Sequence, residues 1–218
     1  MITPSDKEYR EAKQIKKGEK PIPHPYSYLA DWIQSKYSVN VLNVSYRKIE
    51  SINRPRLSID LETEEDRQVF ERSRFCIDPK KSSAVIRKFK EISERESIGL
   101  SFNNIFSIFS AFEPIARIEA NENVPEELAN RLIKQFPNEN IWCIQKAFST
   151  LIIFYYSGVE KDQAVKRGMI NQYQNAYADI IEPYDEFGYL NSNPIIPEID
   201  SKENFDKNYQ SSWFYYWR

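Results

Sequence analysis

Apolar residues in the first half of the chain follow a helical period and then a strand period. After the proline-rich segment 21–25, apolar side chains recur every three or four residues over 28–37, which predicts an amphipathic helix. Over 39–46 and 57–61 the period changes to two, in runs rich in the β-branched and aromatic residues that strands favour. The stretch 51–55 between these runs contains asparagine and proline, so we expect the two runs to form a β-hairpin.

Two helix starts follow the expected hairpin. Thr63 precedes three acidic residues, which is typical of an N-cap and a first helical turn, and this helix is expected to continue through Phe75. Asp78 and Pro79 then supply a second N-cap and a proline at the first helical position. The apolar stripe behind them predicts a helix that ends near Glu96.

The second half of the chain is richer in strand signals. Its pattern predicts, in order, a strand over 105–119 interrupted near Pro114, a helix over 128–136, two strands within 141–157 with a turn near 148–150, a helix over 165–181, a polar loop over 191–208 and an aromatic final strand over 213–217. Because the turn near 148–150 is poorly marked, a single long bent strand over 141–157 is the alternative.

From residue 105 onward this order is β-α-β-β-α-β, as in ferredoxin-like domains. With the preceding helix, hairpin and two helices, the sequence predicts an α+β fold in which helices pack on an antiparallel or mixed sheet. Residues 1–25 are expected to form a polar N-terminal arm and a Pro-rich connector, and residues 26–218 a single α+β domain, with 97–104 as an alternative sub-boundary. We find no internal repeat and no family motif, and topology by itself implies no function.

Composition places the protein among folded globular proteins. Of its 218 residues, 41% are hydrophobic and 28% are charged, unlike the polar composition of disordered chains. The net charge of -2 gives no overall attraction to nucleic acids or anionic membranes, so neither is an expected partner. The first twenty residues lack an apolar signal segment, and the longest apolar run, 151–156, is too short to cross a bilayer. Two widely separated cysteines fit a reducing compartment, so we expect a soluble, cytoplasmic protein.

The residue types that catalysis commonly requires are scarce. His24, the only histidine, lies between two prolines and is expected to be exposed and structural. Without a second histidine, Cys76 and Cys143 have no base to activate them, so we expect buried, inert thiols. The chain has only five glycines and contains neither a glycine-rich phosphate loop nor an HExxH motif. We therefore expect no cofactor and no metal site, and lean towards a protein that is not an enzyme.

One pair of carboxylates keeps an enzymatic alternative open. Asp60 and Glu62 lie two residues apart on an expected strand, so their side chains project from the same face. They could share a cation, which makes a carboxylate-dependent hydrolase, and specifically a Mg²⁺-dependent nuclease, the alternative function. The competing interpretation is that the apolar residues of 57–61 take the core face and leave both acids on a solvated surface.

A second alternative is nucleic-acid binding through the basic helix 80–95. Lysine and arginine outnumber the acidic residues of this helix. Stacking on unpaired bases would need an exposed aromatic side chain, whereas Phe89 belongs to the buried stripe of the same helix. A solvated helix face is therefore the favoured interpretation.

Aromatic clusters give the leading functional hypothesis. On strands, the runs 154–156 and 213–217 would place aromatic side chains on both faces of a sheet. Either further layers cover both faces, or one face is exposed and binds a partner. We expect a non-enzymatic, intracellular protein-binding module of the immunity or adaptor kind, which uses the aromatic sheet face and the loop 191–208. The expected partner-binding residues are Trp213, Tyr215, Trp217 and Tyr155, and an aromatic edge or face would also permit self-association.

Overall fold

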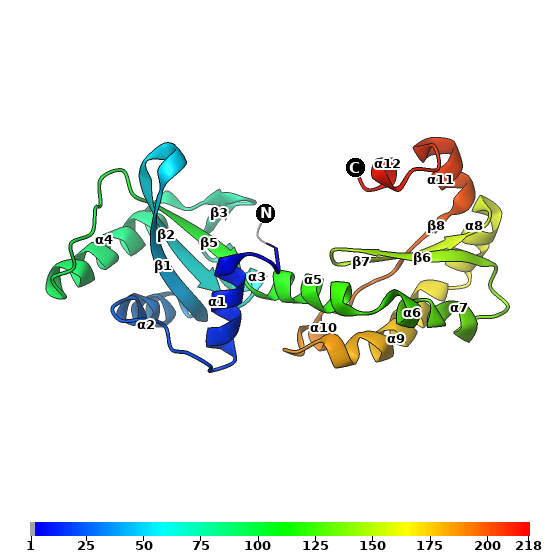
Figure 1. Ribbon diagram of the computed structural model, residues 1–218, viewed down its shortest axis with the longest axis horizontal. Coiled ribbons are helices and arrows are strands. Elements are labelled where there is room, and N and C mark those ends of the chain that lie inside the picture. The colour runs from blue at the N-terminus through cyan, green and yellow to red at the C-terminus, as the bar shows by residue number, and fades with distance from the viewer. Residues whose placement is uncertain (1–2) are drawn as a thin grey trace. The chain divides into compact units, whose positions relative to one another are not determined.

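A computed structural model describes residues 3–218 and divides the chain into two compact units, Met1–Ile115 and Ala116–Arg218. Each unit has its own three-stranded sheet with helices around it (Figure 1), which confirms the α+β class. The division differs from the expected single domain over 26–218 and from the sub-boundary near 97–104. The boundary between the two units lies inside a helix. The stretch 105–119, expected to be one strand, is a short strand followed directly by that helix.

Unit 1 contains a mixed sheet and a small separate hairpin. Its elements are α1 (Lys7–Lys16), α2 (Tyr26–Tyr37), β1 (Val41–Ile49), a 3₁₀ turn (Glu50–Ile52), β2 (Arg54–Leu61), α3 (Glu64–Gln68), β3 (Glu71–Ser73), β4 (Cys76–Ile77), α4 (Pro79–Arg95), β5 (Phe106–Ala111) and the start of α5 (Glu113–Asn123). The strand order is β1-β2-β5, with β1 antiparallel and β5 parallel to β2. Strands β3 and β4 pair with each other.

Side-chain caps begin two helices of unit 1, α3 and α4, where the sequence predicts them. The Thr63 side chain accepts a hydrogen bond from the backbone N–H of Asp66 and begins α3, and the Asp78 carboxylate accepts from Lys80 N–H and begins α4. Helix α3 is shorter than expected, because it ends at Gln68 and the β3–β4 hairpin follows. Pro114 lies in the first turn of α5, where proline is tolerated, so the predicted strand over 105–119 is wrong beyond β5.

The first sheet has one apolar and one polar face. Helices α2 and α4 cover the apolar face, where Leu57 and Ile59 of β2 pack against Leu29 of α2 and Phe89 of α4. The alternate residues of β2 are polar, and α1 lies on their side of the sheet. Tyr9 of α1 is buried against Phe112 with ring centroids 4.9 Å apart. The segment expected as a polar arm is therefore a folded part of unit 1, apart from residues 1–2, which lie outside the described residues.

Unit 2 holds the second sheet. Its elements are the rest of α5, α6 (Glu126–Ala129), α7 (Arg131–Gln135), β6 (Ile141–Ala147), β7 (Thr150–Tyr155), α8 (Gly158–Lys166), α9 (Met169–Ile181), a 3₁₀ turn (Glu182–Tyr184), α10 (Tyr189–Ser192), β8 (Glu198–Ser201), α11 (Lys202–Tyr209) and α12 (Trp213–Tyr216). Strands β6 and β7 form the antiparallel hairpin expected within 141–157, and β8 adds to β7 in parallel. Gly168, with φ of 72°, interrupts the expected helix over 165–181 and separates α8 from α9.

Both units share one strand topology, although the sequence shows no repeat. In each, an antiparallel hairpin is joined by helices to a third strand that pairs in parallel with the second strand of the hairpin. The ferredoxin-like sheet is not formed by the described residues, because β5 pairs with β2 of unit 1 and not with the strands of unit 2. The predicted order from residue 105 is also wrong at its end, because the last strand, β8, lies within the expected loop 191–208 and residues 213–216 form a helix.

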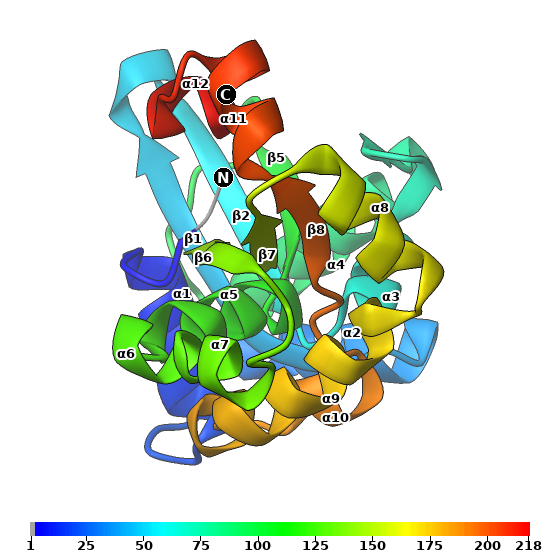
Figure 2. The ribbon, with the colours of Figure 1, turned by 90° about the vertical axis from the view of Figure 1, so that its right-hand side faces the viewer.

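Helices cover both faces of the second sheet. Figure 2 shows α9 on one side of this sheet and α11 and α12 on the other. Leu151, Ile153 and Tyr155 of β7 pack in a core with Tyr173 of α9, while Phe154 belongs to a separate aromatic cluster with residues of α11 and α12. The doubly covered sheet, one of the two interpretations of the aromatic run 154–156, is the arrangement present. Among residues 3–218, no helix is both long and apolar enough to cross a membrane.

Candidate functional site

The last five aromatic residues form a short helix and not the expected strand. In α12 the residues at positions 213 and 216 point to one side, as helical spacing requires, and both pack inward. The Trp213 ring lies 4.1 Å from that of Phe205 and stacks on Trp142 with centroids 6.0 Å apart, while Tyr216 lies 5.2 Å from Phe154. Strand propensity is overridden because this packing partly buries two large rings against the sheet.

A polar anchor also holds α12 in place. The Tyr216 hydroxyl donates a hydrogen bond of 2.7 Å to the Asp200 carboxylate on β8. Asn204 of α11 donates to both oxygens of the same carboxylate, at 3.0 and 2.9 Å. Burial, followed by the bond to Asp200, raises the pKa of Tyr216 above its ordinary value, so the phenol stays protonated and remains a donor.

Inward packing of two rings leaves the other three aromatic residues exposed. Phe214 is 69% exposed, Tyr215 46% and Trp217 38%, and we call these three residues the aromatic surface. Phe214 and Tyr215 have ring centroids 5.5 Å apart, and the Arg218 guanidinium lies 5.6 Å from the Phe214 centroid. Rigidly held tyrosine, tryptophan and arginine side chains are the groups that anchor protein interfaces.

The structure changes the set of expected partner-binding residues. Tyr215 and Trp217 are exposed as the hypothesis requires, but Trp213 packs inward and Tyr155 is buried in the core of unit 2. The Tyr155 hydroxyl donates to Glu139 at 2.7 Å and contacts the Tyr173 hydroxyl, so it serves the interior. Sequence reasoning missed Phe214, because strand alternation placed it on the opposite face, and the expected aromatic sheet face does not exist at 213–217. The expected loop over 191–208 contains α10, β8 and α11.

The charged side chains of α11 balance one another, and Arg218 is the cation that contacts the aromatic surface. On α11, Asp206 pairs with Lys202, and the Glu203 carboxylate accepts from Gly158 N–H at 2.9 Å. Lys207 and Arg218 form no ion pair with any of residues 3–218. The Arg218 guanidinium beside Phe214 therefore favours an acidic group on a partner that contacts the aromatic surface.

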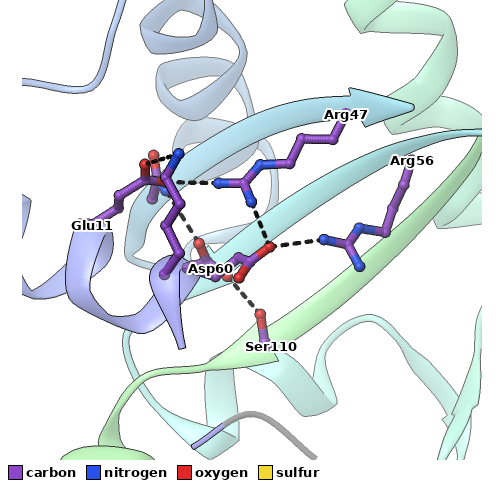
Figure 3. A network of polar contacts seen from close by, with 8 residues as sticks. Glu11, Arg47, Arg56, Asp60 and Ser110 are labelled. Atoms are coloured by element: carbon purple, nitrogen blue, oxygen red, sulfur yellow. Dashed lines mark hydrogen bonds and ion pairs between the residues drawn. The ribbon is translucent and has the colours of Figure 1, made fainter. Parts of the chain in front are cut away.

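A second constellation lies on the polar face of the first sheet, beneath α1 (Figure 3). Asp60 of β2 is only 6% exposed, and its carboxylate accepts hydrogen bonds from Ser110 at 2.6 Å and from Asn43 at 3.3 Å. Above it, Arg47 and Arg56 both donate to Glu8 of α1, at 2.9 and 3.0 Å. These ion pairs fasten α1 over the buried carboxylate.

Burial dominates the electrostatics of Asp60. Loss of water raises the pKa of its carboxyl to about 6, although the bonds from Ser110 and Asn43 favour the charged form. The carboxylate lines a cleft of about 300 Å³ between α1 and the sheet, together with Glu8, Arg56 and Ser110. The arrangement holds a carboxyl group that exchanges its proton near neutral pH in a largely dry position.

Asp60 lies on β2 and Glu62 directly follows this strand, but the two acids do not act as a pair. Glu62 forms an ion pair with Lys16 of α1, whereas Asp60 is bonded to Ser110 and Asn43. Within residues 3–218, no group of three or more histidine, cysteine or acidic side chains has the arrangement of a metal site. The expected solvated acidic surface is wrong for Asp60, because α1 covers it.

Comparison with protein-family models, with curated protein sequences and with solved structures gives no match. The residues of this chain are therefore the sole basis for assigning a function.

The remaining candidate residues take no part in the polar bonds of either constellation, although Cys143 packs against the aromatic cluster beneath α12. His24 is more than half exposed, and its Nε2 lies 3.4 Å from the Glu96 carboxylate. Cys143 is partly buried, and burial raises the pKa of its thiol to about 11, so it is protonated at neutral pH. Cys76, expected to be buried, is exposed on β4. On α4, Phe89 is buried as predicted, and Lys88 and Lys90 pair with acidic residues of the same helix.

Proposed function

We propose that the protein is a non-enzymatic binding module that docks to an acidic region of a protein partner through Phe214, Tyr215 and Trp217. The observation that carries the proposal is the split within α12, where Trp213 and Tyr216 are fixed inward while three large aromatic side chains face solvent. Exposing such rings costs solubility, and fixing them beforehand lowers the entropy lost on binding. Two free thiols fit a reducing compartment such as the cytoplasm.

The hydrolase alternative receives less support from the geometry. Its two carboxylates have separate partners, and a hydrolytic site would need both to face one substrate. An Asp60→Ala, Glu62→Ala double variant tests it: this alternative requires that any phosphodiesterase activity of the wild type be lost.

Affinity capture with matched variants tests the proposal. Wild type, a Phe214→Ser, Trp217→Ser variant and a Phe148→Ser control are each immobilised and exposed to an extract of the source organism. Phe148 is a suitable control because it is 56% exposed in a turn of the same unit, away from any aromatic cluster. We expect one stoichiometric partner, retained by wild type and control and lost by the double variant. Equal recovery by all three proteins would rule out the aromatic surface.

Self-association is separated from this result by sedimentation of the purified protein. If the partner is a different protein, the purified wild type is expected to sediment as a monomer at micromolar concentration. A dimer that the Phe214→Ser, Trp217→Ser variant dissociates would instead make a second copy of the chain the occupant of the surface.

A further inference from the structure

The hairpin formed by β3 and β4 carries an aromatic side chain that its backbone disfavours. The register pairs Ser73 with Cys76, so Arg74 and Phe75 form a two-residue turn. Phe75 has φ of 65°, a left-handed conformation that favours glycine or asparagine and costs a bulky residue free energy. Its ring is 75% exposed and lies outside the core clusters described above for residues 3–218. Stability therefore does not explain a phenylalanine at this position.

The base of the hairpin is braced by charged side chains. The Glu71 carboxylate accepts the backbone N–H of Phe75 at 2.9 Å and the Arg67 guanidinium at 2.7 Å. Arg67 also donates twice to Glu64 on α3, at 2.8 and 2.5 Å. Asp78 N–H closes the hairpin by donating to the Phe70 carbonyl at 2.8 Å. The strained turn is thus held in one conformation and presents the Phe75 ring to solvent.

One cation contacts the exposed ring, and two more lie close to it in the sequence. The Arg74 guanidinium lies 5.1 Å from the Phe75 centroid, and Arg72 and Lys80 are exposed close to it in sequence. None of these three cations forms an ion pair within residues 3–218, whereas the neighbouring acids Glu71 and Asp78 are engaged in the brace and in the cap of α4. An open aromatic face beside unpaired cations is the arrangement that binds an unpaired base and its phosphates.

We propose that the β3–β4 hairpin binds single-stranded nucleic acid, with a base stacked on Phe75 and phosphates held by Arg72, Arg74 and Lys80. The hairpin also offers the exposed aromatic ring that the basic helix α4 lacks. Phe89 of that helix is buried, whereas Phe75, in the hairpin that precedes it, is exposed. Duplex bases are already stacked and do not offer a free face to the ring. The apolar area of one short hairpin tip is small for anchoring at a membrane.

Fluorescence anisotropy with the full-length protein tests the proposal. The probe is a labelled mixed-sequence oligonucleotide of about 12 nucleotides, offered as a single strand and as a duplex. We expect the single strand to bind more tightly. Three phosphate contacts predict that affinity falls about eighteenfold between about 50 and about 200 mM salt.

Variants at the turn separate stacking from folding. Phe75→Gly suits the left-handed backbone, so it is expected to keep or raise stability while lowering affinity about tenfold through loss of stacking. Phe75→Trp is expected to restore binding, because its ring is larger. Phe148→Gly is the matched control: Phe148 also has positive φ, 53°, and is exposed in the β6–β7 turn, and its removal should leave affinity unchanged.

Charge variants test the phosphate contacts. Arg72→Ser with Arg74→Ser should flatten the dependence of affinity on salt. No binding at low salt, equal affinity for duplex and single strand, or equal affinity of wild type and Phe75→Gly would each overturn the proposal. Binding to phosphatidylserine vesicles without binding to the oligonucleotide would overturn it as well, in favour of a membrane surface.

Discussion

At the residue scale, the side chain with the most unusual surroundings is Asp60. Strand alternation correctly places it opposite Leu57 and Ile59. Alternation could not predict that Asp60 is buried, because the residues that cover it come from α1. The sequence of α1 is largely polar and does not indicate that this helix packs on a sheet. The partners Asn43 and Ser110 come from strands 17 and 50 residues away, and no local pattern connects them.

The stability of the protein should therefore depend on pH through Asp60. The pKa of its carboxyl is about 6 in the folded state, against 3.8 for an unperturbed aspartate. Because the unfolded chain loses this proton first, stability falls as pH rises from about 4 to about 6 and then levels, at a cost of about 3 kcal/mol. Asp60→Asn removes that cost, since asparagine resembles the protonated acid.

Chemical denaturation at several pH values measures this difference. We expect Asp60→Asn to be more stable than wild type by up to about 3 kcal/mol at pH 7, and to differ little near pH 4. Groups that titrate identically in both proteins cancel in the comparison. A difference that is independent of pH would show that Asp60 does not titrate as its burial requires.

At the element scale, caps and periodicity predicted where α2, α3 and α4 start and where the first hairpin lies. The side chains of Thr63 and Asp78 accept hydrogen bonds from backbone N–H groups two or three residues further along the chain. Their capping role can therefore be predicted without knowledge of the fold. The C-terminal aromatic run could not be predicted in the same way, because it suits a strand by propensity and a helix by spacing. The choice between helix and strand depends on tertiary packing against the rings of Trp142, Phe154 and Phe205.

Alanine substitutions distinguish a helix from a strand at 213–217. On a strand, Trp213 and Trp217 would share a face and behave alike. On α12, Trp213 packs inward while Trp217 is exposed, so we expect Trp213→Ala to lower the free energy of unfolding by about 2–3 kcal/mol and Trp217→Ala by under about 1 kcal/mol. Thermal or urea unfolding measures both. Equal losses in the two variants would contradict the helical arrangement.

At the scale of the whole molecule, two units with separate cores share one strand topology. The sequence did not reveal them, because a repeated topology needs only equivalent hydrophobic patterns, and because the boundary lies inside α5, where no flexible linker marks it. The parallel third strand of each unit was also hidden, since parallel pairing joins segments separated by helices.

Separate cores predict separate unfolding. Leu57 is buried in unit 1 and Leu151 in unit 2, and Trp32 is the only tryptophan of unit 1. In a Trp32→Phe background, fluorescence follows unit 2 alone. Leu151→Ala should lower the fluorescence midpoint, at a cost of about 3 kcal/mol, whereas Leu57→Ala should shift only the transition seen by circular dichroism. Equal shifts of both signals by both variants would show a single cooperative transition.

The most direct test of the proposed function is site-specific photocrosslinking in cells. A benzoylphenylalanine placed at position 214 should crosslink one protein with an acidic contact region, and the same group at position 148 should not. Crosslinks to that protein from both positions, or from neither, would contradict docking through Phe214, Tyr215 and Trp217.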